Sequence, residues 1–137
     1  MESKATARLR ERDKEILDRK TFAHLATLMP DGSPQVTPVW AGYEGYRIVV
    51  NSAEGRVKPR NVRNDSRVAL AATDPDNPYE AVIVRGHVDE ITHEGADEHI
   101  DAMAKKYLDE DEYPFRQPVE QRVKIYIQPE VVKGANE

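Results

Sequence analysis

The chain has 137 residues, a formal net charge of −5 at neutral pH and no cysteine. This length suits one domain spanning residues 1–137, and the lack of cysteine excludes disulfides, thiolate catalysis and cysteine-ligated metal centres. No apolar run reaches the ~18 residues of a membrane helix and the first residues lack an apolar signal core, so we expect a cytoplasmic protein with no membrane partner.

The first part of the chain predicts one helix followed by three strands. Residues 3–20 are highly charged with apolar side chains along one narrow face that Asp13 interrupts, which predicts an exposed amphipathic helix whose beginning frays. Because Pro34 and Pro38 cannot donate to a sheet, we expect the second strand to lie at an edge or to be irregular. A meander of hairpins is predicted, with strands at 22–29, 35–41 and 46–51 and turns at 30–33 and 42–45.

The second part of the chain alternates between helices and strands. The apolar run at 81–84 predicts a strand that is buried on both faces, whereas strict alternation in the last strand predicts one buried face. The elements are a helix at 58–64, a strand at 67–73, a loop at 74–78, a strand at 80–91, a helix at 97–108 and a strand at 121–128. Six strands with two or three helices predict a small antiparallel barrel with helices packed at its ends.

The charge of the chain is unevenly distributed. Between Arg56 and Arg67, five cations face one acid, so this window carries +4 and leaves −9 for the rest of the chain. A strand and a glycine lead here into a helix start, where free N–H groups and the helix dipole favour an anion. We interpret Arg56 and Lys58 as phosphate ligands, and Arg63 and Arg67 as part of a solvated basic face. The net charge argues against a nucleic-acid partner.

Other features of the sequence carry weaker signals. The polar side chains and broken pairing of residues 35–40 could present backbone groups to a planar ring, although Trp40 taken alone is more simply core filling. His93 and His99 lie among acidic residues, but their spacing matches no zinc motif, so we predict no metal site. No Ser-His-Asp arrangement has a recognisable context, and the sequence singles out no catalytic residue.

In their order and spacing, several of these segments resemble the pyridoxamine-5′-phosphate-oxidase-like split β-barrel superfamily. Within it, the chain is most similar to the branch of coenzyme F-420-dependent flavin/deazaflavin oxidoreductases. The resemblance runs from about residue 22 to residue 132. It is carried by residues 25–28, 30–34, 36–40, 55–58, 60–61, 67–70, 74–79 and 84–86.

The resemblance implies a homodimer of six-stranded antiparallel split β-barrels of Greek-key type, with peripheral helices and two cofactor sites at the subunit interface. It implies that Arg56 and Lys58 hold the cofactor phosphate, with Arg60 and Asn61 close by. The residues implied to flank the ring are Gln35, Val36, Thr37, Pro38 and Trp40 of the second strand and Val50, Asn51 and Ser52 of the third. Candidates for completing the site from the partner subunit are Tyr79, Tyr113, Lys124 and Tyr126.

On this resemblance we expect an oxidoreductase that binds coenzyme F-420 and transfers a hydride to or from a small organic substrate. The cofactor would carry the hydride, and the protein would supply orientation and electrostatics. FMN is the alternative cofactor. A non-catalytic protein that binds a flavin or a tetrapyrrole is the alternative function, because no catalytic side chain is evident in the sequence.

Overall fold

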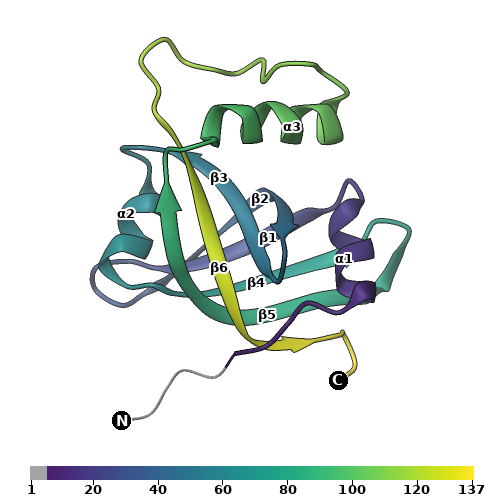
Figure 1. Ribbon diagram of the computed structural model, residues 1–137. Helices are drawn as coiled ribbons and strands as arrows, with labels where there is room; N and C mark the ends of the chain where they lie inside the picture. Colours follow the sequence, from purple (N-terminus) through teal and green to yellow (C-terminus); the bar gives the residue numbers. More distant parts are fainter. Residues whose placement is uncertain (1–5) are drawn as a thin grey trace.

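Six antiparallel strands close into a barrel in the computed structural model, which describes residues 6–137 (Figure 1). Neighbouring strands follow the order β1-β2-β3-β6-β5-β4, which confirms the predicted six-stranded antiparallel barrel. The strands are β1 (Phe22–Leu28), β2 (Pro34–Glu44), β3 (Arg47–Ala53), β4 (Arg67–Asp74), β5 (Asn77–Thr92) and β6 (Arg122–Lys133). The helices in this part of the chain are α1 (Glu11–Asp18), α2 (Val57–Asn64) and α3 (Ala96–Leu108).

Side chains that alternate along the strands fill the barrel. In β6, every second residue from Val123 to Ile127 is fully buried, as the spacing predicts. The prediction that residues 81–84 are buried on both faces is wrong, because Ile83 points away from the core and is 40% exposed. The outer face of β5 therefore carries exposed apolar surface.

Strand β2 changes partner along its length, and this splits the barrel on one side. Residues 34–40 pair with β1, whereas residues 41–44 pair with β3. Strand β3 pairs with β2 along one edge, and along its opposite edge it pairs with β6 from Ile48 to Ala53. In the described chain, the edge of β2 around Pro38 that faces away from β1 has no strand partner. This open edge is the irregularity that the two prolines predict, since proline is tolerated where no ladder bond is needed.

Two predicted turns are shorter in the structure because the strands extend further. The turn predicted at 42–45 is reduced to residues 45–46, and the loop predicted at 74–78 is reduced to residues 75–76. The second turn is closed by the carboxylate of Asp74, which accepts the backbone N–H two residues later at 2.9 Å. Side-chain capping of this kind lets a polar sequence turn within two residues.

The first helix is shorter than the predicted segment 3–20, of which residues 1–5 lie outside the described part of the chain. Asp13, which interrupts the apolar stripe, lies in the first turn of the helix. Its carboxylate is fully buried and accepts the backbone N–H of Arg10 at 2.7 Å, so the helix begins immediately after Arg10. No helix within residues 6–137 is long and apolar enough to span a bilayer.

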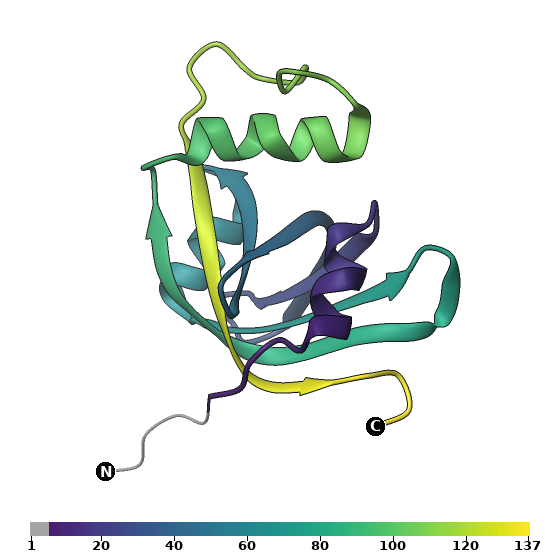
Figure 2. The same cartoon turned by 45° about the vertical axis from the view of Figure 1, so that its right-hand side comes forward.

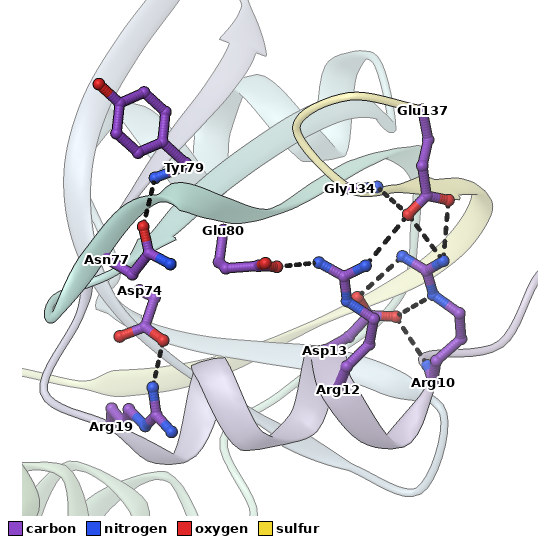
Figure 3. Close-up of polar contacts among 10 residues, drawn as sticks. All are labelled: Arg10, Arg12, Asp13, Arg19, Asp74, Asn77, Tyr79, Glu80, Gly134 and Glu137. Carbon is purple, nitrogen blue, oxygen red and sulfur yellow. Dashed lines mark hydrogen bonds and ion pairs between the residues drawn. The ribbon is translucent and has the colours of Figure 1, made fainter.

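Ion pairs tie α1 to later parts of the chain (Figure 3). Arg19, just after the helix, pairs with Asp74 at the end of β4. Arg12 pairs with Glu80 of β5 at 2.5 Å and with Glu137 near the C-terminus at 3.3 Å. The helix is thus fastened beside the β4–β5 turn, away from the split in the barrel.

Helix α3 lies across one end of the barrel (Figures 1 and 2). The hydroxyl of Tyr107 donates to the carbonyl of Thr21 at 2.6 Å and accepts the N–H of Ala41 at 3.2 Å. The ammonium of Lys106 donates to the carbonyls of Leu17 and Ala41, and its burial lowers the pKa to about 8. These contacts hold α3, and the loop that follows it, beside the open edge of β2.

Candidate functional site

A cavity of about 250 Å³ lies between the open edge of β2, the start of α2, helix α3 and the loop 109–121. We call it the cationic cavity, because one side is apolar and aromatic and the other carries three cations. Its lining residues are Phe22, Pro38, Val39, Trp40, Asn51, Arg56, Lys58, Ile100, Tyr113, Phe115 and Arg122.

Helix α2 begins at the cationic cavity with a local sequence that does not favour a helix start. Gly55 has φ +88°, which lets the chain leave β3 and turn into the helix. Arg56 occupies the N-cap position without a capping side-chain hydrogen bond, and the first turn holds no acidic residue. Cations such as Arg56 and Lys58 oppose the dipole at this end of a helix. This start is therefore poor for stability but well suited to an anion.

Lys58 is the cation of the cavity that lacks an internal counterion. Its side chain is half-buried, and within residues 6–137 it has no hydrogen-bond or ion-pair partner. Burial lowers its pKa, and the neighbouring charges of Arg56 and Arg122 lower it further. A half-buried ammonium facing two guanidinium groups is unfavourable unless an anion joins them. The positive charge of the cavity thus favours a negatively charged ligand.

Arg122 is the fixed cation of the cavity. Its guanidinium donates to the carboxylate of Glu120 at 2.8 Å and to Asn51 Oδ1 at 2.8 Å, and it lies 5.0 Å from the ring centroid of Tyr113. The side chains of Glu120 and Arg122 are 4% and 3% exposed. Arg56 is less buried, since its side chain is 46% exposed and its Nη2 lies 3.6 Å from Glu120 Oε2.

The amide of Asn51 connects β3 to α3. Its Nδ2 donates to the carbonyl of Ala96 and to Nδ1 of His99, each at 2.9 Å, while its Oδ1 accepts from Arg122. Burial lowers the pKa of His99 to about 4, so the imidazole is neutral at physiological pH and can accept this bond. Within the described residues, no group of three His, Cys, Asp or Glu side chains could hold a metal ion.

Aromatic rings build the apolar side of the cavity. Trp40 stacks on Tyr107, with 5.1 Å between ring centroids and 4° between ring planes, and Tyr113 meets Trp40 edge-on at 6.1 Å. The loop that carries Tyr113 is tied back to α3, because the Tyr113 N–H donates to Asp101 at 2.8 Å and Arg116 pairs with the same carboxylate at 2.7 Å. These contacts with Asp101 therefore fix the position of Tyr113 on the apolar side of the cavity.

The structure brings five of the predicted site residues to the cationic cavity and places the others elsewhere. Strand alternation turns Val50 into the barrel core, and Ser52 is fully buried. Asn61 is buried and donates to Thr27 Oγ1 at 3.0 Å, so its amide ties α2 to β1. Arg60 is exposed outside the cavity lining. The residues at the cavity are Pro38, Trp40, Asn51, Arg56 and Lys58, and those of β2 outside its lining are Gln35, Val36 and Thr37.

Sequence reasoning missed Arg122 and did not place Tyr113 in the cavity of its own chain. Arg122 is the second residue of the predicted strand 121–128, but nothing local signals that β6 brings it beside β3. Tyr113, predicted as a partner-subunit residue, lines the cavity of its own chain. Two other partner candidates are engaged within the chain, since Lys124 and Tyr126 contact Glu44 at 2.7 and 2.9 Å.

A second hollow of about 600 Å³, which we call the outer hollow, lies on the outside of the barrel. It is formed mainly by small and apolar side chains of five neighbouring strands, β2, β1, β4, β5 and β6. Val36, which pairs in register with Ala26 of its lining, is 62% exposed. The lining residues are Ala26, Thr27, Leu28, Pro34, Arg67, Val68, Ala69, Arg85, Gly86, Glu130 and Val131.

Comparison with known proteins relates the chain to one family. The family model described as pyridoxamine 5′-phosphate oxidase matches residues 9–135. An F420 reductase is 31% identical over 90% of this chain and 98% of that one, with a TM-score of 0.78. A comparison with curated proteins finds no match.

More distant structures share the fold. A conserved hypothetical protein from Mycobacterium tuberculosis is 22% identical over 98% of this chain and 89% of that one, with a TM-score of 0.71. General stress protein 26 from Bacillus anthracis is 17% identical over 92% of each chain, with a TM-score of 0.67.

Proposed function

Because the chain belongs to the pyridoxamine 5′-phosphate oxidase family, we propose that it is an oxidoreductase that holds a flavin-type cofactor by its phosphate in the cationic cavity. The observation that carries this proposal is Lys58, a half-buried cation without an internal counterion at an uncapped helix start. A phosphate supplies the missing negative charge and accepts from Arg56, Lys58 and the free N–H groups of the helix.

The other walls of the cavity suit the planar ring of such a cofactor. Pro38 and Trp40 present apolar surface beside an edge of β2 whose backbone groups have no strand partner in the described chain. Tyr113 and Phe115 line the cavity from the loop 109–121 and add aromatic surface. When bound, the cofactor would supply the hydride chemistry, whereas the chain binds and orients it.

Within this function we propose coenzyme F-420 as the cofactor, with FMN as the alternative. The similarity to an F420 reductase across nearly the whole length of both chains supports the deazaflavin. Titration of the pure protein with F-420, FMN and riboflavin, followed by fluorescence, tests the proposal. We expect micromolar or tighter binding of F-420 and weaker binding of riboflavin, which has no phosphate. If neither F-420 nor FMN bound, the proposal would be wrong.

A non-catalytic carrier is the second candidate function. Among the described residues that line the cavity there is no carboxylate and no histidine, so no conventional proton donor of those types faces the ligand. Stopped-flow reduction and reoxidation of the bound cofactor with small organic donors and acceptors separates the two functions. Turnover would establish the oxidoreductase, whereas a bound cofactor that no reagent reduces or reoxidises would favour the carrier.

We also propose that the protein acts as a homodimer in which a second copy covers the outer hollow. A volume of about 250 Å³ is below the usual ~300–1,000 Å³ of ligand pockets, so one chain supplies only part of the site. Val36 of the outer face lies on the same side of β2 as Pro38 of the cavity, which makes the two surfaces continuous. Apolar surface such as Val36 and Ile83 is typical of a covered face.

Sedimentation equilibrium at micromolar concentration tests the dimer. We expect twice the chain mass of 15.6 kDa for the natural sequence, and the single mass for a variant that carries Val36→Asp and Ile83→Asp. The aspartates would place charges in a buried apolar interface. A natural protein that sediments as one chain at these concentrations would contradict this part of the proposal.

A further inference from the structure

Glu120 is a buried carboxylate that does not line the cationic cavity but pairs with two of its cations. Its side chain is 4% exposed, and it contacts both arginines of the cavity, Arg122 at 2.8 Å and Arg56 at 3.6 Å. Arg122 has two further partners, Asn51 and the ring of Tyr113. The Glu120 charge is therefore not the sole means of positioning Arg122.

The charge balance of the cavity depends on Glu120. Three cations, Arg56, Lys58 and Arg122, and one carboxylate give a net charge of +2. A ligand anion bound by Arg56 would share this guanidinium with Glu120. Each negative charge on the ligand then meets the same repulsion from the carboxylate, because Coulomb energy scales with the product of the charges.

We propose that Glu120 shifts the selectivity of the site toward a singly charged phosphodiester, because its repulsion penalises a doubly charged phosphomonoester about twice as strongly in free energy. This inference rests on the proposed function and names the cofactor class within it. The phosphate of coenzyme F-420 is a diester and that of FMN is a monoester. A repulsive element aimed at the unwanted ligand is a common route to specificity.

The test compares three ligands that share one ring, either flavin or deazaflavin, whichever the natural protein binds. They are the uncharged riboside, its 5′-phosphate and the methyl ester of that phosphate. At pH 7.5 the monoester is close to doubly charged, since its second pKa is about 6, and the methyl ester is singly charged. Dissociation constants are measured by fluorescence titration for the natural protein and for Glu120→Gln.

For Glu120→Gln we expect the diester to bind about 10-fold more tightly and the monoester about 100-fold more tightly, with riboside binding unchanged. The ratio of the monoester dissociation constant to the diester dissociation constant, which we call the diester preference, thus falls about 10-fold. Equal changes for diester and monoester would overturn the proposal and leave Glu120 as a positioning residue for Arg122. A riboside affinity that changes as much as the others would overturn it in the same way.

Three control variants distinguish an effect of the Glu120 charge on binding from an effect of the substitution on folding. Glu120→Asp keeps the negative charge and should keep the preference within about threefold. Glu15→Gln removes an exposed carboxylate of α1 and should leave all three affinities unchanged. The double variant Glu120→Gln with Arg122→Gln restores a net charge of +2 without a buried unpaired charge, so it remains informative if the single variant does not fold.

We expect the double variant to show the preference of the natural protein within about threefold. A 10-fold change in that preference would contradict control by charge. Failure of all three ligands to bind the natural protein would overturn the proposed function itself. Binding with the same preference in every variant would overturn only the role of Glu120.

Discussion

Replacing Arg56 and Lys58 together by alanine should weaken binding of the phosphorylated cofactor by more than about 100-fold. Each side chain would make a charge-assisted hydrogen bond to the phosphate, a contact with a contribution of ~1.5–3 kcal/mol. Losing both costs at least about 3 kcal/mol, which corresponds to about 100-fold in Kd. Binding of the unphosphorylated riboside should change little, because the two cations meet the phosphate and not the ring.

Fluorescence titration of both ligands measures this effect, and circular dichroism verifies the fold. The fold should survive, since neither cation has a capping role and both oppose the helix dipole. A matched variant, Arg63→Ala with Lys20→Ala, removes two positive charges outside the cavity lining and should bind like the natural protein. Unchanged affinity for the phosphorylated cofactor in the first variant would place the phosphate elsewhere on the molecule.

Gly86→Ala should have the largest effect on stability, lowering the free energy of unfolding by about 3 kcal/mol. A Cβ at this position would collide with the backbone carbonyl of Gln128 and lie 3.1 Å from Cα of Pro129. Gly86 faces Pro129 where the register of β5 and β6 shifts, so neither backbone can retreat without disturbing the ladder. The penalty lies at the upper end of that for overpacking a core.

Thermal denaturation measures this loss as a decrease of about 10 °C in Tm. Gly42→Ala is the matched control, because it makes the same substitution in β2. A Cβ at Gly42 would meet only the side chain of Met103 at 3.9 Å, which is an ordinary contact. We expect the control to change Tm by no more than a few degrees. If both variants unfolded at the same temperature, steric packing would not explain why a glycine occupies position 86.

The order and type of the helices and strands could be predicted from the sequence because local pattern dominates there. Alternation predicts the buried face of β6, and a helical stripe predicts α3 within one residue of its observed start. The predicted ends of helices and strands are less accurate where side chains act as caps. Asp13, which interrupts the apolar stripe, serves in the structure as the buried acceptor at the start of α1.

The site could be predicted only where its residues are close together in the chain. Arg56 and Lys58 stand out because a charge cluster coincides with a helix start, both of which are visible locally. The position of flanking residues such as Val50 is harder to predict from the sequence. Proximity to the site along a strand does not determine which face of the sheet a side chain lies on.

By itself, the sequence determined a small acidic antiparallel barrel with one cationic helix start. The tertiary structure alone decided which cations share a cavity. Arg122 and Glu120 lie more than sixty residues beyond Arg56 in the chain, and only the pairing of β3 with β6 brings them together. Pairing between strands distant in sequence depends on the closure of the whole barrel, so no local pattern encodes it.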